Sequence, residues 1–282
     1  MALDLKNLSI RTVSGLVYAG LLIGAIVCGP LASGILMAIF AVLASYELES
    51  NTVRKDNPSN WFVTWLLDAA ILAVIILSMG IIIPLSVAAP IYCFLLILRF
   101  LFQIFISQKN PLKSISLVCL EQFYVGLPLC GFVAFVFGVS NPWIVVCALS
   151  MIWINDTGAY LVGSQFGRHK MFPVLSPKKS WEGFFGGLVF NIGAAFVFYY
   201  CFRLDSYPIL NSVSGWVYIG LCVSVFATLG DLFESMLKRS LGIKDFGNII
   251  PGHGGILDRI DSLLFVVPYL AFALFIGNLI LL

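Results

Sequence analysis

The sequence predicts an all-α polytopic membrane protein with about nine transmembrane helices and polar cytoplasmic loops. Of its 282 residues, 60% are hydrophobic and 11% are charged, and the mean hydropathy is +1.02. Soluble domains carry roughly 25% charged residues, so this composition excludes an ordinary soluble domain. The low-charge stretches reach about 20 residues, the length that a helix needs to cross a bilayer. Helices are expected because the bilayer core offers backbone N–H and C=O groups no other partner.

The expected spans follow one another with short connections. The first apolar run begins near Val13, and because many others follow it we interpret it as a retained helix and not as a secretory signal. Gly29-Pro30 and the segment from Gly138 to Pro142 are typical of tight hairpins between neighbouring spans. The spans are expected at roughly 12–29, 31–50, 61–80, 84–106, 116–138, 141–163, 183–202, 213–232 and 262–282.

Candidate chemistry is distributed unevenly along these spans. The first four carry few polar residues, whereas the last five, from about residue 116, carry nearly all of the candidates. We therefore predict two parts that share one membrane body. Residues 1–115 form N-terminal transmembrane helices, and residues 116–282 form a C-terminal transmembrane catalytic part.

Lysine and arginine residues indicate the orientation, because they accumulate in cytoplasmic loops. With the N-terminus in the cytoplasm, Arg203 falls in an outer loop and Arg99 lies within the fourth span, which leaves 14 of the 16 basic residues on the cytoplasmic side. An error of one span would destroy this asymmetry, so the asymmetry also supports the number of spans.

Acidic residues follow the same orientation. Asp68 lies deep in the third span, where it could pair with Arg99 or a lysine, or belong to the wall of a cavity. A polar cavity open to the cytoplasm is the simplest arrangement for the others, because charge in hydrocarbon is costly. Four acids fall toward the cytoplasmic ends of their spans: Glu121, Asp156, Asp231 and Asp261.

Two polar loops interrupt the apolar sequence, at residues 164–183 and 232–260. The first contains SPKKSWEG, and the second contains KRSLGIKD and PGHGGILDR. Glycine lets backbone N–H groups approach a bound anion, and lysine supplies a point charge for phosphate. Ordinary positive-inside loops would explain basic residues alone, but they fit poorly with the paired Lys178-Lys179 or the turn at His253, Gly254 and Gly255. We therefore predict phosphate contacts in both loops.

Carboxylates are paired at helical spacing around the second loop. Asp231 and Glu234 are three residues apart, as are Asp258 and Asp261, so each pair would share a helix face. Carboxylates held close together repel unless a cation lies between them, and Mg²⁺ usually binds through one or two carboxylates and substrate phosphates. We predict Asp231, Asp258 and Asp261 as metal ligands. Alternatively, Asp258 and Asp261 form structural ion pairs with a nearby basic residue: Arg259, Lys238 or Arg239.

A third polar segment, NDTGAY at Asn155 to Tyr160, ends a span. Asp156 could bind a second cation or a nucleotide hydroxyl, or it could be an ordinary acid at a helix end. His253 could donate a hydrogen bond to a phosphate or hold the Gly-Gly turn. A general base is not needed for a phosphate nucleophile, because its second pKa of about 6 leaves it mostly ionised at neutral pH. His169, in a basic loop, is interpreted as a surface or lipid-headgroup contact.

Together these motifs resemble the CDP-diacylglycerol synthase family, also called phosphatidate cytidylyltransferase. Two upstream features match, DTGAY at Asp156–Tyr160 and SPKKSWEG at Ser176–Gly183, although Ser180 stands where threonine is more usual. The specific motifs cover about residues 155–261, and the N-terminal half resembles the family only as a run of hydrophobic spans. The C-terminal signature is present at fixed spacing: Ser235, Lys238, Arg239, Lys244, Asp245, Gly247, Pro251, His253, Gly254, Gly255, Asp258, Arg259 and Asp261.

The resemblance implies a reaction of phospholipid biosynthesis. The phosphate of phosphatidic acid attacks the α-phosphorus of CTP, so that CDP-diacylglycerol forms and pyrophosphate leaves. The resemblance implies Mg²⁺ as cofactor and suggests a second cation that could be monovalent. As catalytic residues we predict Lys178, Lys179, Lys238, Arg239 and Asp258. As substrate-binding residues we predict Ser176, Ser235, Lys244, Asp245, His253, Gly254, Gly255, Arg259 and Asp156.

Two other functions stay open. A CTP-dependent kinase or cytidylyltransferase acting on a polyprenol or another lipid would use the same loops. An ion transporter could use Asp68, Glu121 and Asp156, although the polar residues cluster on one side and no inverted repeat is visible.

The expected setting is an integral protein of the bacterial inner (cytoplasmic) membrane, with the N-terminus and the active site in the cytoplasm. No nucleic-acid partner is expected. A homodimer is possible, because the glycine-rich span from Gly183 to Gly193 could form a helix interface within one chain or between two.

Overall fold

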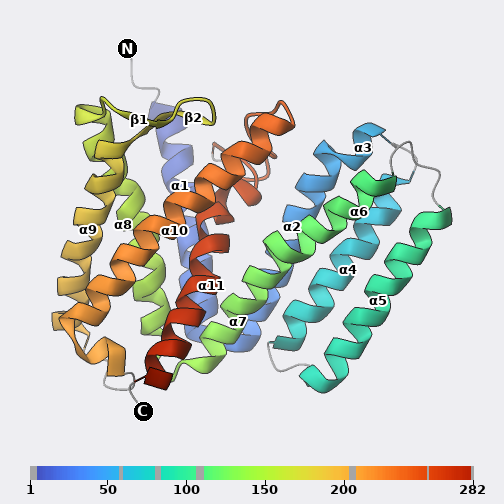
Figure 1. Ribbon diagram of the computed structural model, residues 1–282, viewed down its shortest axis with the longest axis horizontal. Coiled ribbons are helices and arrows are strands. Elements are labelled where there is room, and N and C mark those ends of the chain that lie inside the picture. Colours follow the sequence, from blue (N-terminus) through green and yellow to red (C-terminus); the bar gives the residue numbers. More distant parts are fainter. Residues whose placement is uncertain are drawn as a thin grey trace. The chain divides into compact units, whose positions relative to one another are not determined.

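The computed structural model describes residues 5–56, 60–79, 84–105, 111–202, 208–252 and 254–280 (Figure 1). The chain divides into two compact units. The first unit consists of Met1–Phe137 and Leu241–Ile260, and the second consists of Gly138–Ser240 and Asp261–Leu282. The predicted parts 1–115 and 116–282, which concern where the chemistry lies, stay a prediction.

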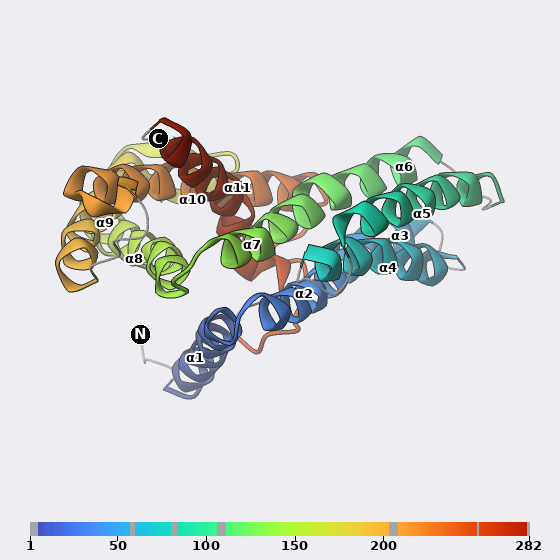
Figure 2. The ribbon, with the colours of Figure 1, turned by 90° about the horizontal axis from the view of Figure 1, so that it is seen from below.

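The first unit is a bundle of apolar helices. Helix α2 packs against α1 and α4, α4 packs against α5, and α5 packs against α6 (Figure 2). Leu72, Leu129 and Phe132 are among its fully buried residues. The helices are α1 (Leu5–Cys28), α2 (Pro30–Asn51), α3 (Val53–Asp56), α4 (Trp61–Met79), α5 (Leu85–Phe105), α6 (Pro111–Leu120), the π-helix η1 (Glu121–Gly126) and α7 (Leu127–Gly138).

The second unit combines long helices with one short hairpin. Helix α9 packs against α8, and α10 packs against both (Figure 1). Strands β1 and β2 pair antiparallel, with Lys170 opposite Ser180. The sequence predicted only a polar loop here, and the hairpin is therefore an addition. The elements are α8 (Trp143–Phe166), β1 (Lys170–Phe172), β2 (Ser176–Ser180), α9 (Trp181–Cys201), η2 (Pro208–Asn211), α10 (Val213–Ser240) and α11 (Leu257–Ile280), of which the residues before Asp261 belong to the first unit.

The predicted all-α membrane architecture is confirmed. Within the described ranges, seven helices are long and apolar enough to cross a membrane, and α1 carries a shorter apolar stretch, Thr12–Cys28. Several helices extend beyond the predicted spans, and the last two show this clearly. Helix α10 continues to Ser240 instead of ending near 232, and α11 begins at Leu257 instead of near 262. Hydropathy marks where the apolar face ends, but a helix can continue into polar sequence when neighbouring groups satisfy its backbone.

Glycines of α9 let that helix approach α8 closely. A Cβ at Gly187 would lie 2.5 Å from Asn155 Oδ1 and 2.8 Å from the Asn155 carbonyl oxygen. A Cβ at Gly186 would lie 2.5 Å from Val162 Cβ. These glycines therefore form an interface within one chain, which is one of the two arrangements that the sequence left open.

Replacing Gly187 by alanine should destabilise the protein by about 1–3 kcal/mol, because the added methyl group overpacks the contact with Asn155. The matched control is Gly193→Ala in the same helix, since a Cβ at Gly193 meets no atom within 4 Å. Alanine there should stabilise the helix by up to about 1 kcal/mol. Thermal unfolding of both variants in detergent checks the difference, and equal midpoints would contradict close packing at residue 187.

Candidate active site

A cavity of about 570 Å³ opens in the second unit between α8, the β hairpin, the start of α9 and α10. This volume lies within the range of small-molecule sites, roughly 300–1,000 Å³. Four of the predicted site residues line it: Asp156 from α8, Lys178 and Lys179 from β2, and Asp231 from α10. The cavity therefore combines cationic and acidic side chains from segments up to 75 residues apart (231 − 156).

Lys179 contacts two neighbouring groups in this cavity. Its Nζ lies 2.7 Å from Asp231 Oδ2 and donates to the carbonyl oxygen of Thr228 at 3.3 Å. The Lys179 side chain is 22% exposed and that of Asp231 is 41% exposed, so the pair is still reachable from the cavity. Ser180, directly after it, caps α9 by accepting a hydrogen bond from the Gly183 N–H at 3.2 Å. This cap fixes the end of the strand that carries both lysines.

Three carboxylates gather where α10 meets α11: Asp231, Glu234 and Asp261. One oxygen of each lies within 4.8 Å of one oxygen of each other. Asp231 and Glu234 are one helical turn apart, as their spacing predicted, and Asp261 comes from α11. The helices can approach because residue 230 is glycine: a Cβ there would lie 2.6 Å from the Asp261 carbonyl oxygen.

Basic and hydroxyl groups surround these carboxylates. Lys238 Nζ donates to Glu234 Oε2 at 2.6 Å, and the Ser235 hydroxyl donates to Asp231 Oδ1 at 3.4 Å. If all three acids are ionised, Lys179 and Lys238 balance two of the negative charges, and the formal charge of the group is −1 (−3 + 2). Carboxylate oxygens are the ligands that Mg²⁺ prefers, so this donor set fits the predicted magnesium ion.

The second polar loop is built around a different carboxylate, in the first unit. Asp258 Oδ2 accepts hydrogen bonds from the backbone N–H groups of Phe246 and Gly255, each at 2.9 Å. Asp258 is buried. This oxygen therefore holds the loop closed at the start of α11.

Glu47 of α2 caps the same helix. Its two oxygens accept hydrogen bonds from the N–H groups of Ile256 and Leu257, each at 2.9 Å, and the side chain is 1% exposed. The first N–H groups of a helix have no partner inside the helix, and its N-terminus carries partial positive charge, so a carboxylate stabilises it. Glycine is required beside this cap, because a Cβ at Gly255 would collide with both Glu47 oxygens.

A sequence model described as the cytidylyltransferase family matches residues 9–276. The chain belongs to this family.

Individual relatives agree with the family match. The phosphatidate cytidylyltransferase of Staphylococcus aureus (strain COL) is 44% identical over 128 residues, which cover 45% of this chain and 46% of the relative. The phosphatidate cytidylyltransferase of Bacillus subtilis (strain 168) is 38% identical over 188 residues, which cover 64% of this chain and 66% of the relative. The phosphatidate cytidylyltransferase of Haemophilus influenzae is 42% identical over 125 residues, which cover 44% of this chain and 43% of the relative. The chain thus spans between 43% and 66% of the length of these curated relatives.

The remaining predicted residues of this cytidylyltransferase-family chain lie in several places. Ser176 is half-buried in β2, and Arg239 Nε donates to the Leu175 carbonyl oxygen at 3.4 Å. Asp258 lies in the first unit, so its assignment as a metal ligand stays a prediction. His253 lies outside the described residues. The other predicted residues of the first unit are Lys244, Asp245 and Arg259, which are exposed, and Gly254 and Gly255, which form the turn before α11.

Sequence reasoning missed two residues of this arrangement. Glu234 was noted for its spacing from Asp231 but was not included among the metal ligands, and that spacing was the available signal. Glu47 gave no signal, because it is separated by 209 residues from the Ile256 N–H that it binds. The predicted surface position of His169 is confirmed: the ring is exposed, and its Nδ1 lies 2.6 Å from Glu182 Oε1.

Proposed function

We propose that this protein transfers CMP from CTP to phosphatidic acid, giving CDP-diacylglycerol and pyrophosphate in phospholipid biosynthesis. The observation that carries this proposal is the group of Asp231, Glu234 and Asp261 beside the cavity that contains Lys179. A cation and a lysine side by side suit a reaction between two phosphates. The relatives named phosphatidate cytidylyltransferases support the choice of substrates.

Transfer of CMP between two phosphate groups requires that the substrates are positioned and that their negative charge is neutralised. A phosphatidate oxygen forms a bond to the α-phosphorus of CTP, and the bond between this phosphorus and the bridging oxygen of the β-phosphate breaks. Because the lipid phosphate is already mostly ionised at neutral pH, with its second pKa at about 6, no side chain has to remove a proton. Lys178 and Lys179 would neutralise phosphate oxygens in the cavity, and the Ser176 and Ser235 hydroxyls would orient them.

Mg²⁺ would be held by Asp231, Glu234 and Asp261 and would supply charge neutralisation for the phosphates. Lys179 would then leave Asp231 and contact a substrate phosphate, because the metal competes for the Asp231 carboxylate and the phosphate competes for the Lys179 ammonium group. A second, monovalent cation remains part of the proposal, with Asp156 as the nearby acid on the cavity wall.

Radiolabelled CTP tests the reaction directly. Purified protein with phosphatidic acid and Mg²⁺ should place α-phosphate label in the lipid and release pyrophosphate, with no γ-phosphate label in the lipid. Transfer of γ-label would indicate a kinase, and turnover with a polyprenyl phosphate but not with phosphatidic acid would indicate the related lipid enzyme. Ion flux in proteoliposomes without CTP turnover would favour a transporter.

The membrane setting that we propose is the bacterial inner membrane with the site facing the cytoplasm, supported by the distribution of lysine and arginine. CTP does not cross a sealed bilayer. Added CTP should therefore be used by inside-out vesicles and not by right-side-out vesicles of the same preparation, and the reverse result would refute this orientation. Association into a homodimer stays a prediction.

A further inference from the structure

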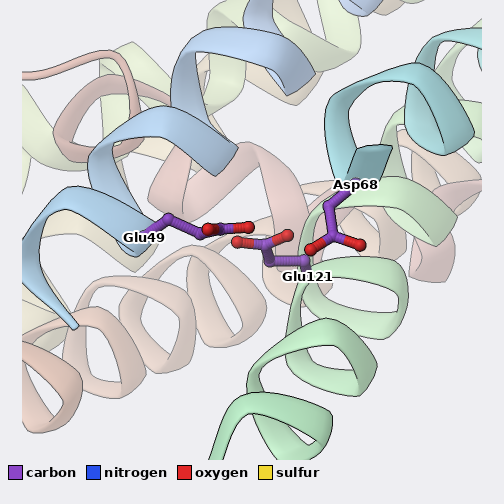
Figure 3. A group of neighbouring side chains, drawn as sticks. All are labelled: Glu49, Asp68 and Glu121. Atoms are coloured by element: carbon purple, nitrogen blue, oxygen red, sulfur yellow. The ribbon is translucent and has the colours of Figure 1, made fainter. Parts of the chain in front are cut away.

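A second group of carboxylates lies in the first unit, among residues that the proposed reaction does not use. Glu49 of α2, Asp68 of α4 and Glu121 of η1, here called the buried triad, each place an oxygen within 4.8 Å of the other two (Figure 3). The exposed fractions are 1%, 1% and 0%. Figure 3 shows the three carboxyl groups turned toward one another from three separate elements.

Neighbouring polar groups donate hydrogen bonds to some, but not all, of the carboxylate oxygens of the buried triad. Asp68 is paired with Arg99, whose Nε lies 2.9 Å and 3.1 Å from the two Asp68 oxygens. This contact confirms one of the arrangements that the sequence left open for Asp68. The Thr64 hydroxyl donates to Glu49 Oε2 at 2.8 Å, and the Ser45 hydroxyl donates to Glu121 Oε2 at 3.2 Å.

The other oxygens of the two glutamates have no such donor. Both Glu49 Oε1 and Glu121 Oε1 are buried, and neither accepts a hydrogen bond from a donor in the described part of the chain. A buried polar atom normally has a hydrogen-bond partner, and an exception calls for a specific explanation such as a bound ion. Because both atoms belong to side chains that point into the triad, their missing partner should lie inside it.

The charge of the buried triad also favours a bound cation. If all three acids are ionised, their charges and that of the Arg99 guanidinium paired with Asp68 sum to a formal charge of −2 (−3 + 1). Uncompensated charge in a membrane interior is costly, and acids there are typically paired or mark an ion site. One divalent cation would cancel this charge, and oxygen ligands favour hard ions such as Mg²⁺, Ca²⁺ or Mn²⁺. Glu121 also opens a π-helical segment, a conformation that is frequent at functional sites.

We propose that the buried triad binds one hard divalent cation, with Glu49 Oε1 and Glu121 Oε1 as ligands and Asp68, held by Arg99, as the third acid. The site is made of other residues than the carboxylates of α10 and α11. It would tie α2, α4 and η1 together in the first unit. The proposal does not depend on the proposed reaction.

Mn²⁺ binding to the full-length protein in detergent tests this site, using electron paramagnetic resonance to count bound ions at up to millimolar Mn²⁺. The double variant Glu49→Gln/Glu121→Gln should bind one Mn²⁺ fewer per chain than the unmodified protein. Asp261→Asn, which alters the other carboxylate group, should keep the ion of the buried triad. Glu182→Gln, a partly exposed acid on α9, is the matched control and should bind as many ions as the unmodified protein.

Two outcomes would overturn the proposal. One is an equal number of bound Mn²⁺ ions in the double variant and the unmodified protein. The other is an infrared band of protonated carboxyl groups at neutral pH that persists with saturating Mn²⁺ and disappears in the double variant, since protons would then neutralise the triad. If the double variant does not fold, Glu121→Gln alone should weaken binding of this ion at least tenfold, and unchanged affinity would count against the site.

Discussion

Replacing Asp261 by asparagine is expected to lower the rate of CMP transfer at least about a thousandfold while leaving the fold intact. The substitution removes one negative charge from the group with Asp231 and Glu234, so that Lys179 and Lys238 balance the two remaining carboxylates. A divalent cation would then lose both a ligand and its electrostatic attraction. The fold should tolerate the change, because the amide oxygen of asparagine can still accept the Ser262 N–H bond that Asp261 Oδ1 accepts at 2.6 Å.

Steady-state kinetics at saturating CTP and phosphatidic acid, with a Mg²⁺ titration, measure this loss. Raising Mg²⁺ should restore little activity, and the thermal midpoint should match that of the unmodified protein. A folded Asp261→Asn protein with an unchanged kcat would exclude Asp261 as a ligand of the reacting metal.

The second large effect is expected at Glu47, which never touches substrate in the proposed mechanism. Glu47→Ala should destabilise the protein by about 3–5 kcal/mol, because two charge-assisted hydrogen bonds of roughly 1.5–3 kcal/mol each are lost and the N–H groups of Ile256 and Leu257 stay buried without an acceptor. Glu47→Gln should recover only part of this, because its carbonyl can accept one N–H while its amide group opposes the other.

Amide hydrogen exchange shows which residues lose protection in Glu47→Ala. Amides of residues 241–257 should exchange faster in Glu47→Ala, because the N–H groups of Ile256 and Leu257 lose the side-chain oxygens that hold this segment against α2. Amides of α8 and α9, in the second unit, provide the internal control and should be unaffected. Uniformly faster exchange, or none, would show that the cap does not organise this loop.

Much of the architecture could be predicted from the sequence because bilayer chemistry leaves few choices. Apolar stretches of helical length appear as helices, and the tight connection at Gly29-Pro30 separates α1 from α2. Helix ends were less predictable, because Lys238 and Arg239 extend α10 beyond its apolar residues and hydropathy does not record this. The π-helical segment that begins at Glu121 was also hidden, since it depends on packing.

The site was predictable where its parts are close in sequence and hidden where they are distant. Helical spacing pointed to Asp231, Glu234 and Asp261, and the paired lysines of the first polar loop pointed to Lys179. The contacts of Glu47 with the start of α11, and of Glu49 with Asp68 and Glu121, join segments from different helices. No periodicity in one sequence reports such contacts, because they arise from which helices become neighbours.

Gly230 has a consequence for which ions the second unit can accept. The absence of a side chain there lets the backbones of α10 and α11 nearly touch, and this contact fixes how far the Asp261 carboxyl group stands from Asp231. The radius of ion that these oxygens can enclose is thus set by a residue that carries no ligand atom. The spacing of the main chains would then determine whether the site prefers small or large cations. Comparing only the acidic residues of related sequences would not reveal this preference.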